Sequence, residues 1–402
     1  MTGVFGTDLL NTVDAYDLVV VGAGLSGAVI AQQLAQQGKT VLVVEQRNHV
    51  AGNCFDYVNE YGVCVHQYGP HLFHTDNETV WDYLSTFTEW HPYEHRVLAD
   101  IDNRLGPIPF NLNSLECWFN PEVAERLAKL LIDTYGFGTE IPIMVLRQSE
   151  AQGLRELAEF VYHKLFLNYT VKQWGVTPEQ ISPEVVARVP VRISYDDRYF
   201  KDRFQAVPVA GYTEMIKTIL DHPNITLVLA TDARPFVGFD KASGNILWCN
   251  KVYLGRLIYT GMLDELFDYC YGQLSYRSLQ FQFQTLGQSE YQPATTVNYP
   301  NHPAMTRVTE FKHILGLQPA STTIVTEYPR DYIRDGDEKN IPYYPMLNAE
   351  NMSRYNQYKT LASAFSRFYP VGRLAEYRYY DMDDAVANAL LVAENLLAEY
   401  QT

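Results

Sequence analysis

The chain has 402 residues, 47% of them hydrophobic and 19% charged, which is enough for two or three domains around a large buried core. Its formal net charge of −16, with no basic stripe, argues against nucleic acid as a partner. Five cysteines, an odd number without CxxC spacing, argue against a disulfide framework and a zinc site and indicate a cytoplasmic location.

The first residues lack the basic start and the long apolar run of a signal peptide, and residues 1–14 are expected to form a loose extension. The apolar stretch 18–35 contains three glycines, two glutamines and a serine. That composition predicts a strand, a turn and a helix, and we therefore expect no membrane span.

The next predicted element is a strand–turn–helix–strand unit around a GxGxxG loop. Residues 17–21 read as a buried strand, 22–27 as the loop, 28–37 as a helix and 41–44 as the next strand. Glycines in the loop permit a tight turn, close approach to a pyrophosphate and close helix packing, and an acid ending the second strand binds ribose hydroxyls. The expected dinucleotide contacts are Gly22, Gly24, Ser26, Gly27 and Glu45.

The sequence after this unit favours FAD as the dinucleotide. The segment QRNHVAGNC follows the second strand, and a second loop with Arg47, Gly52 and Asn53 is typical of FAD proteins. An NAD dehydrogenase would run on into another βαβ unit, whereas this chain continues with polar and aromatic sequence. We therefore expect FAD, with Gln46 and Asn53 among its contacts.

Three histidines follow close together, so a metal site has to be weighed. His66, His71 and His74 lie around a Gly-Pro loop with no carboxylate at ligand spacing, and no metal is expected. The better interpretation is that the segment YGPHLFH passes beside the flavin ring. His71 and Leu72 are then candidate cofactor contacts.

The rest of the chain predicts two further domains. Apolar residues at helical spacing between about 115 and 170 indicate a helical insert, and alternating residues at 191–205 and 278–328 indicate antiparallel strands. We predict an α/β protein: a Rossmann-like FAD-binding domain with a helical insert and an antiparallel β-sheet domain. The predicted boundaries are 15–90, 206–272 and 342–402 for the discontinuous FAD-binding domain, 91–174 for the helical domain, and 175–205 with 273–341 for the antiparallel sheet, or substrate, domain.

Three arginines lie in apolar or aromatic sequence: Arg188 in ARVPVR, Arg307 in MTRVTEFKH and Arg373 in GRLAEYRYYD. A guanidinium in a partly dry site is a good bidentate phosphate ligand, although any one of them alone fits a buried salt bridge equally well. Trp174 in NYTVKQWG fits either a core position or a stack on a base.

The last predicted helix begins after Asp381, its expected N-cap, and its apolar residues follow helical spacing. The N-terminus of a helix carries partial positive charge. Aimed at the pyrimidine edge of a flavin, it would stabilise the anionic reduced form. Arg373, Met382 and Ala385 are the expected cofactor contacts at this end.

Taken together, these motifs resemble the bacterial UDP-galactopyranose mutase family over residues 17–397. The matching segments, in order, include VVGAGLSGAVIAQQL, EQRNHVAGN, YGPHLFHT, NYTVKQWG, ARVPVR, TRVTEFKH and GRLAEYRYYDM. The resemblance implies an FAD enzyme that interconverts UDP-galactopyranose and UDP-galactofuranose without net redox change. In that reaction N5 of the reduced flavin forms a covalent adduct with the sugar and displaces UDP, and the sugar recloses with the other ring size. A reductant such as NAD(P)H and a homodimer are also implied.

The resemblance also implies roles for single residues. Arg188, on a mobile loop, and Arg307 would clamp the diphosphate, Asp381 would be the acid near the flavin, and the backbone of His74 would face the flavin. His95 stands where the family commonly has Asn and is kept as a candidate substrate contact. The other implied substrate contacts are Tyr169, Thr170, Trp174, Tyr199, Asn298, Tyr344 and Tyr379.

Two alternatives stay open from the sequence. One is an FAD-dependent amine oxidase or desaturase-like oxidoreductase with the same nucleotide fold, and the other is a non-catalytic flavin sensor. The pair Arg188 and Arg307, together with KQWG, favours a nucleotide-sugar enzyme. Asp383 and Asp384 add negative charge to the first turn of the last helix, and we expect them to lower the flavin potential slightly.

Overall fold

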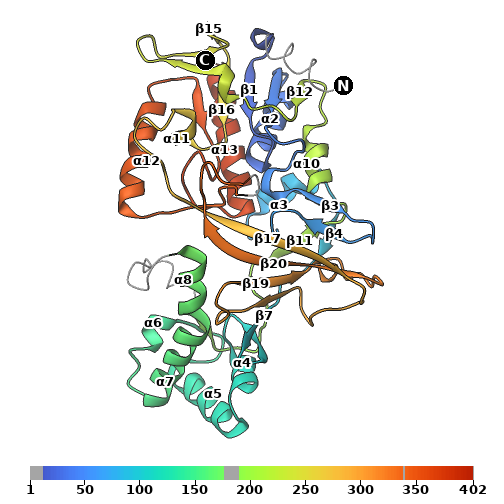
Figure 1. Ribbon diagram of the computed structural model, residues 1–402, viewed down its shortest axis with the longest axis vertical. Helices are drawn as coiled ribbons and strands as arrows, with labels where there is room; N and C mark the ends of the chain where they lie inside the picture. The colour runs from blue at the N-terminus through green and yellow to red at the C-terminus, as the bar shows by residue number, and fades with distance from the viewer. Residues whose placement is uncertain (1–11, 176–189, 338–339, 402) are drawn as a thin grey trace.

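The computed structural model describes residues 12–175, 190–337 and 340–401. The molecule is elongated, with a parallel sheet flanked by helices at one end, a long twisted sheet across the middle and a group of helices at the other end (Figure 1). In the described ranges, no helix combines the length and the apolar character that a membrane crossing requires.

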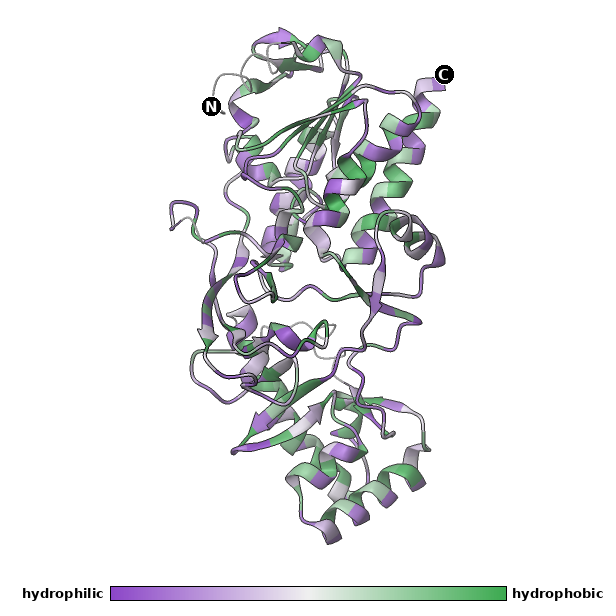
Figure 2. Ribbon diagram, turned by 90° about the vertical axis from the view of Figure 1, so that its right-hand side faces the viewer, coloured by the Kyte–Doolittle hydropathy of each residue, from purple (hydrophilic) through white to green (hydrophobic). Residues whose placement is uncertain are grey.

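The parallel sheet contains the predicted dinucleotide-binding unit. Its strands follow the order β12-β2-β1-β16-β22, and each neighbouring pair is parallel. The three central strands β2, β1 and β16 are mostly buried, whereas the edge strands β12 and β22 are only partly buried. The strands of this sheet are largely hydrophobic (Figure 2), as expected where both faces of a sheet are covered. Their bounds are β1 Leu18–Val21, β2 Val41–Val44, β12 Ile225–Val228, β16 Arg256–Tyr259 and β22 Phe368–Pro370.

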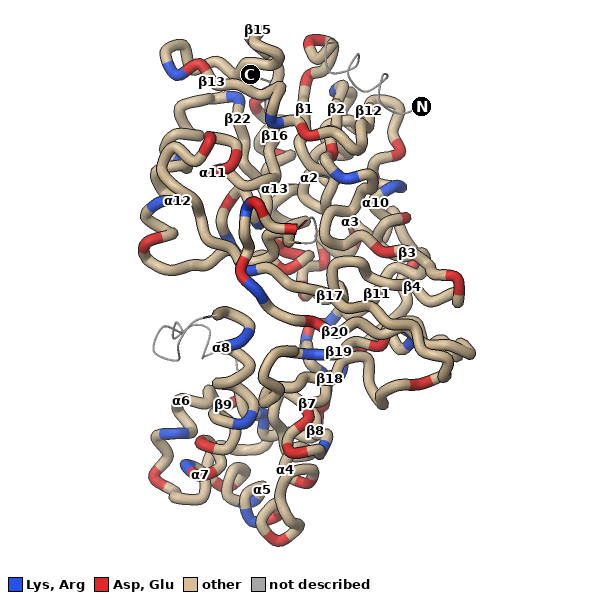
Figure 3. Tube along the Cα trace, in the orientation of Figure 1, with Lys and Arg blue, Asp and Glu red and all other residues tan. Residues whose placement is uncertain are grey.

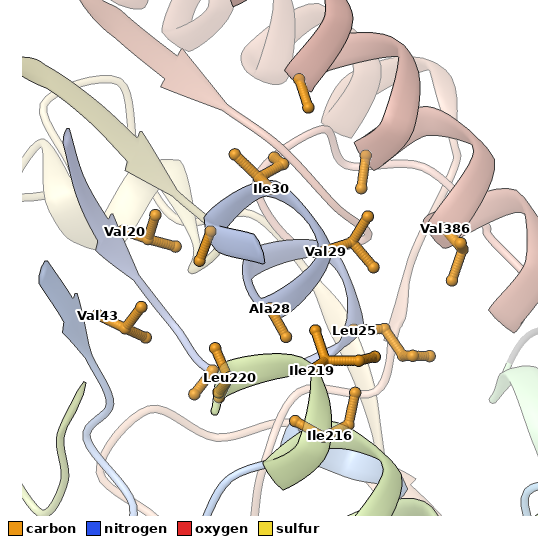
Figure 4. Close-up of a cluster of buried hydrophobic side chains, with 14 of the residues drawn as sticks. Val20, Leu25, Ala28, Val29, Ile30, Val43, Ile216, Ile219, Leu220 and Val386 are labelled. Carbon is orange, nitrogen blue, oxygen red and sulfur yellow. The ribbon is translucent and has the colours of Figure 1, made fainter. Parts of the chain in front are cut away.

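Alternate residues of these strands point to opposite faces of the sheet. On one face, Val20 and Val43 pack against the helices α2, α10 and α13 (Figure 4). On the other, Val19 and Leu42 pack against α11, α12 and a small sheet β13-β14-β15. The elements on the two faces are α2 Leu25–Gln36, α10 Tyr212–Leu220, α13 Met382–Gln401, α11 Leu263–Leu266, α12 Ala349–Ala362, β13 Val237–Asp240, β14 Asn245–Trp248 and β15 Lys251–Val252.

The middle of the molecule is a seven-stranded sheet of order β21-β17-β20-β19-β18-β7-β8. Its longest pair, β17 with β20, is antiparallel, as the alternation in this part of the sequence predicts. The bounds are β7 Val97–Ile101, β8 Arg104–Ile108, β17 Tyr276–Leu286, β18 Thr296–Asn298, β19 Arg307–Glu310, β20 Thr322–Asp331 and β21 Tyr344–Pro345.

One part of the predicted helical domain is corrected here. The segment 97–108 forms the strands β7 and β8, and β7 pairs in parallel with β18, with Val97 opposite Thr296. Val97, Ala99 and Ile101 alternate as buried residues and are therefore suited to one face of a sheet. Their partner strand lies far along the chain, so residues 97–108 belong to the large sheet and are not helical. The domain boundary at residue 91 stays a prediction.

The helical end is built from α4 to α8 around a core that includes Leu127, Leu131 and Leu154. Asn111 and Asn120 cap α4 and α5 through their side-chain oxygens, and a π-helical turn at 162–167 leads into α8. The bounds are α4 Leu112–Trp118, α5 Pro121–Tyr135, α6 Ile143–Leu146, α7 Gln152–Val161 and α8 Asn168–Trp174.

Short elements join these parts. The strand β11 pairs with β5 and β6, β3 pairs with β4, and β9 pairs with β10. The pairing of β5 with β11 fixes the backbone of Phe73 and His74, the last two residues of the YGPHLFH segment. The bounds are β3 Asp56–Val58, β4 Cys64–His66, β5 Phe73–Thr75, α3 Glu78–Ser85, β6 Trp90–Pro92, β9 Glu140–Pro142, β10 Pro190–Arg192 and β11 Phe204–Pro208.

Candidate functional site

A long cleft runs along the carboxyl ends of the parallel strands, where open α/β sheets bind their ligands. It brings together the glycine loop, the loop after β2, the start of α13 and the segment before it. All but one of the predicted cofactor contacts line it. They are Gly22, Gly24, Ser26, Gly27, Glu45, Gln46, Asn53, His71, Arg373, Met382 and Ala385.

The exception is Leu72, which does not line this cleft. Its side chain packs against a hydrophobic cluster that includes Val65, Phe311 and Val325. A contact of Leu72 with a cofactor stays a prediction.

Glycines leave parts of the cleft floor without side chains. A Cβ on Gly27 would overlap the carbonyl oxygen of Gly22, and a Cβ on Gly52 would lie 3.1 Å from the Cα of Gly24. Gly52 also has a positive φ of +54°, which disfavours a side chain there. The backbone of both loops is therefore open to a ligand, as the diphosphate of a dinucleotide requires.

Glu45 holds the two loops together at the end of β2. Its Oε2 accepts a hydrogen bond from the backbone N–H of Ala23 at 2.8 Å, and its Oε1 accepts one from Arg47 at 2.9 Å. A carboxylate can accept further hydrogen bonds, so these contacts leave capacity for ribose hydroxyls. The Arg47 guanidinium donates to Asn53 Oδ1 at 3.0 Å and thereby fixes the second loop.

The N-terminus of α13 faces the other end of the cleft. Asp381 precedes the helix, and its carbonyl accepts a hydrogen bond from Ala385 at 3.1 Å. Burial raises the pKa of the Asp381 carboxyl. Arg373 donates to the carbonyl of Tyr380 at 2.8 Å, which holds its guanidinium beside the first turn of the helix. The helix N-terminus and Arg373 supply positive charge here, beside the carboxyl groups of Asp381, Asp383 and Asp384.

The three clustered histidines have different surroundings. His66 is buried and its Nδ1 accepts the backbone N–H of His71 at 3.0 Å. Burial lowers the pKa of His71 to about 3, so it is neutral in the cleft. His74 on β5 contacts Asp202 through Nδ1 at 3.1 Å and stacks on Phe200 with ring centroids 3.6 Å apart. The backbone role implied for His74 stays a prediction.

Within the described ranges, one group with spacing suitable for a metal is Asp56, Cys64 and His66. The Asp56 carboxylate already accepts backbone N–H groups from Tyr212 at 2.7 Å and Thr213 at 2.9 Å. It thus caps the N-terminus of α10. This structural role accounts for its burial.

Arg307 on β19 forms the centre of a second group of predicted residues. Its Nε lies 2.8 Å from Oε2 of Glu327 on β20, and the Glu327 side chain is only 1% exposed. Burial raises the pKa of Glu327, whereas Arg307 lowers it. The pair holds the guanidinium at Nε, and within the described ranges its other two nitrogens make no hydrogen bond, so they can bind an anion.

Two tyrosines lie within electrostatic range of this guanidinium. Tyr169 on α8 and Tyr344 on β21 both interact electrostatically with Arg307. Tyr344 stacks on Tyr379 at 6.1 Å between ring centroids, and Trp174 lies 6.2 Å from Tyr344. Residues from α8, β21 and the segment before α13 therefore meet at one place, as the sequence resemblance implies.

Tyr199 and His71 connect this group to the cleft. Tyr199 interacts electrostatically with both Arg307 and Asp381, and His71 interacts with both Arg307 and Arg373. In Figure 3 basic positions lie on β19 and on α8, near the middle of the molecule. The two groups thus form one continuous candidate site.

Three more predicted substrate contacts lie at or beside it. His95 is buried, lies 5.7 Å from Tyr199 between ring centroids, and has its pKa lowered to about 3 by burial and by Arg307. Asn298 pairs with Arg307 across β18 and β19, and its buried Oδ1 has no partner in the described part of the chain. Thr170 is buried on α8 beside Tyr169. Arg188 lies outside the described residues.

The sequence reasoning did not select several residues of this site. Glu327 was missed, although a charged residue among the apolar residues of TTIVTEY is a signal for a buried pair. Thr231 to Ala233, in the loop after β12, and Thr260, directly after β16, also line the cleft. The rule that ligands bind at the carboxyl ends of parallel strands would have found them.

Comparison with known proteins identifies the family. The sequence profile described as UDP-galactopyranose mutase matches residues 164–379, and that of an NAD(P)-binding Rossmann-like domain matches residues 20–87. The chain is 36% identical over 388 residues to UDP-galactopyranose mutase from Mycoplasma pneumoniae, covering 95% of this chain and 96% of the relative. This chain belongs to the UDP-galactopyranose mutase family. The family resemblance inferred from the motifs is thereby confirmed.

Other relatives of this family member extend the comparison. A probable UDP-galactopyranose mutase from Klebsiella pneumoniae is 37% identical over 384 residues, covering 95% of each chain. A dTDP-fucopyranose mutase from Escherichia coli is 33% identical over 379 residues, covering 94% of this chain and 97% of the relative.

Solved structures confirm the predicted fold class. A crystal structure of reduced UDP-galactopyranose mutase has a TM-score of 0.69 at 16% identity, covering 95% of this chain and 94% of that one. A putrescine oxidase has a TM-score of 0.58 at 12% identity, covering 96% and 99%. These likenesses concern the fold alone, which both solved structures share with this chain.

Proposed function

We propose that this protein interconverts UDP-galactopyranose and UDP-galactofuranose with FAD as its cofactor. The observation that carries the proposal is Arg307, a guanidinium held by a buried carboxylate, near two tyrosines and linked through His71 to the predicted dinucleotide cleft. The sugar of a nucleotide whose diphosphate binds Arg307 would lie next to a cofactor bound in the cleft. An amine substrate would gain nothing from such a cation.

FAD fits the cleft for reasons that are independent of the family. The glycine floor admits a diphosphate, Glu45 has capacity for ribose, and α13 with Arg373 supplies positive charge at the other end. When bound and reduced, FAD supplies a nucleophilic N5 atom for the anomeric carbon and returns unchanged, so the reaction has no net redox change.

The residues of this chain position the sugar and stabilise charge. As the bond between the anomeric carbon and the diphosphate breaks, negative charge develops on UDP, and Arg307 stabilises it through charge-assisted hydrogen bonds. Arg188 is the second proposed arm of this clamp. Tyr199, Tyr344 and Tyr379 donate hydroxyl hydrogen bonds to the diphosphate. Holding UDP in place lets it return to the sugar after the ring has changed size.

Neutral polar groups face the sugar in this scheme. His95, with its pKa lowered to about 3, exchanges hydrogen bonds with hydroxyls without adding charge. The unpartnered Oδ1 of Asn298 accepts a hydroxyl. Trp174 and Tyr169, with Thr170, form the uracil end of the pocket. The described chain thus supplies binding and electrostatics rather than a side-chain nucleophile.

The proposal extends to the partners. A reductant such as NAD(P)H has to reduce FAD before the first turnover, and the active form is a homodimer. The five cysteines are free thiols, which agrees with the reducing cytoplasm proposed as its compartment.

The test is a product assay on the holoenzyme. UDP-galactofuranose is incubated with oxidised protein and with dithionite-reduced protein under argon, and the nucleotides are separated by chromatography. Conversion to UDP-galactopyranose in the reduced sample alone is expected. A parallel assay of the same protein with dTDP-fucose tests whether it acts on the sugar nucleotide named for the related dTDP-fucopyranose mutase. Oxygen consumption with an amine donor and no sugar conversion would overturn the proposal in favour of an oxidase.

A further inference from the structure

A lysine outside the predicted site ties two parts of that site together. The ammonium group of Lys172, on α8, donates to the backbone carbonyls of Tyr299 at 2.8 Å, His302 at 2.6 Å and Met305 at 2.9 Å. An ammonium has three N–H donors, so all of them are used. The three carbonyls belong to one loop, 299–305, which joins β18 to β19.

The same end of α8 is held from the other side. Arg277 on β17 is 4% exposed and donates to the carbonyls of Gln173 at 2.9 Å and Lys172 at 3.0 Å. It also forms an ion pair with Asp331 on β20. Cations at the C-terminus of a helix satisfy its unpaired carbonyls and interact favourably with its dipole.

The position of this loop gives the contact its significance. The residue directly before the loop is Asn298, and Arg307 follows two residues after Met305. On the other side of the contact, α8 carries Tyr169, next to Thr170. Lys172 therefore joins the helix proposed to bind the base to the loop whose ends present the groups proposed to bind the sugar and the diphosphate.

We propose that Lys172 is a positioning residue, whose ammonium group sets the distance between α8 and Arg307 and thereby the affinity for the nucleotide. Lys172 does not touch substrate, since its donors are occupied by backbone carbonyls. The inference rests on the proposed function for its effect on UDP binding. The contact itself does not depend on that function.

The experiment compares two lysine variants with a matched control. Lys172→Met removes the donors and keeps an unbranched apolar chain, and Lys172→Arg keeps the charge. Lys164→Met is the control, because Lys164 lies close by and pairs with the exposed Asp102 at 3.0 Å. The measurements are UDP binding by calorimetry, KM and kcat of the reduced holoenzyme, the flavin spectrum, and hydrogen exchange of residues 299–305.

Lys172→Met should weaken UDP binding and raise KM by roughly tenfold to a hundredfold, because three charge-assisted hydrogen bonds are lost. We expect kcat to change by less than about threefold and the flavin spectrum to stay the same, since the cofactor cleft is formed by other elements. Exchange in the loop should accelerate. Lys172→Arg should recover most of the UDP affinity, and Lys164→Met should match the wild type.

If hydrogen exchange of residues 299–305 is unchanged in Lys172→Met, the Lys172 contact does not restrain the loop. Faster loop exchange with unchanged UDP affinity would overturn the positioning role. Loss of FAD together with loss of UDP binding would also overturn it, because that result indicates general unfolding. If the wild type itself fails to bind UDP, the proposed function fails instead, and loop exchange still decides whether Lys172 restrains the loop.

Discussion

Replacing Arg307 with alanine separates the binding role of this residue from its structural one. The guanidinium pairs with Glu327 at 2.8 Å and carries the proposed diphosphate contact on its other nitrogens. Losing one partner of a buried charged contact costs roughly 2–5 kcal/mol in binding. At about 1.4 kcal/mol per tenfold change, UDP affinity should fall by roughly 30-fold to 5000-fold.

The structural cost should be smaller than for an ordinary broken ion pair. Removing one partner of a buried pair typically costs about 3–5 kcal/mol because a charge is left buried. Burial already raises the pKa of Glu327, and without the guanidinium the carboxyl can take up a proton instead of staying charged. The double variant Arg307→Ala with Glu327→Gln should therefore regain stability without regaining UDP binding.

The assay is calorimetric titration of UDP into the holoenzyme, with urea unfolding of the same samples. Arg330→Ala is the matched control, because this arginine pairs with the exposed Asp337 on the surface at 2.8 Å. Exposed ion pairs contribute about 0–1 kcal/mol to stability. Losing this one should therefore leave the fold intact, and UDP affinity in the control should change by less than about fivefold. An Arg307→Ala protein that binds UDP as tightly as the control would refute the assignment of the diphosphate site.

Three further changes test other parts of the structure. Gly27→Ala should lose FAD, because the new Cβ overlaps the carbonyl oxygen of Gly22. The ratio of flavin to protein absorbance measures the FAD content. A variant fully occupied by FAD would contradict the role of the glycines in the cleft floor. Burial raises the pKa of Asp264 to about 6, so its carboxyl binds a proton more tightly in the folded protein than in the unfolded chain, and stability is lost as the pH rises from about 4 to about 6. The free energy of unfolding of Asp264→Asn, measured relative to the wild type by urea unfolding, should thus rise by roughly 2–3 kcal/mol from about pH 4 to about pH 7. A difference between variant and wild type that is the same at both pH values would contradict the pKa shift. Asp384 accepts the backbone N–H of Asp381 at 3.3 Å in the first turn of α13. Asp384→Asn should raise the flavin midpoint potential by roughly 10–20 mV, and an unchanged potential with substrate bound would show that this charge does not reach the ring.

The local parts of this protein follow from its sequence. The strand from Val41 to Val44 agrees with the prediction residue for residue, and α13 begins directly after Asp381 as expected. The first helix starts at Leu25, inside the glycine loop and three residues earlier than predicted. These elements could be predicted because their apolar periodicity, caps and glycines act over a few neighbouring residues. The predicted cofactor contacts other than Leu72 line one cleft for the same reason, since the loop that makes the turn also forms part of the cleft floor.

Tertiary structure alone decided the parts that depend on distant partners. Residues 97–108 carry an alternating pattern, but only pairing with β18 makes them strands of the large sheet. Glu327 and Lys172 look like ordinary charged residues in the sequence. Their roles arise from Arg307 on β19 and from the loop 299–305, which lie far from them along the chain. A buried charge is stable only beside its partner, and no local pattern states where that partner will lie. The sequence thus determines which elements form and which dinucleotide motif they carry, whereas the packing of the sheet against α8 determines the geometry of the site.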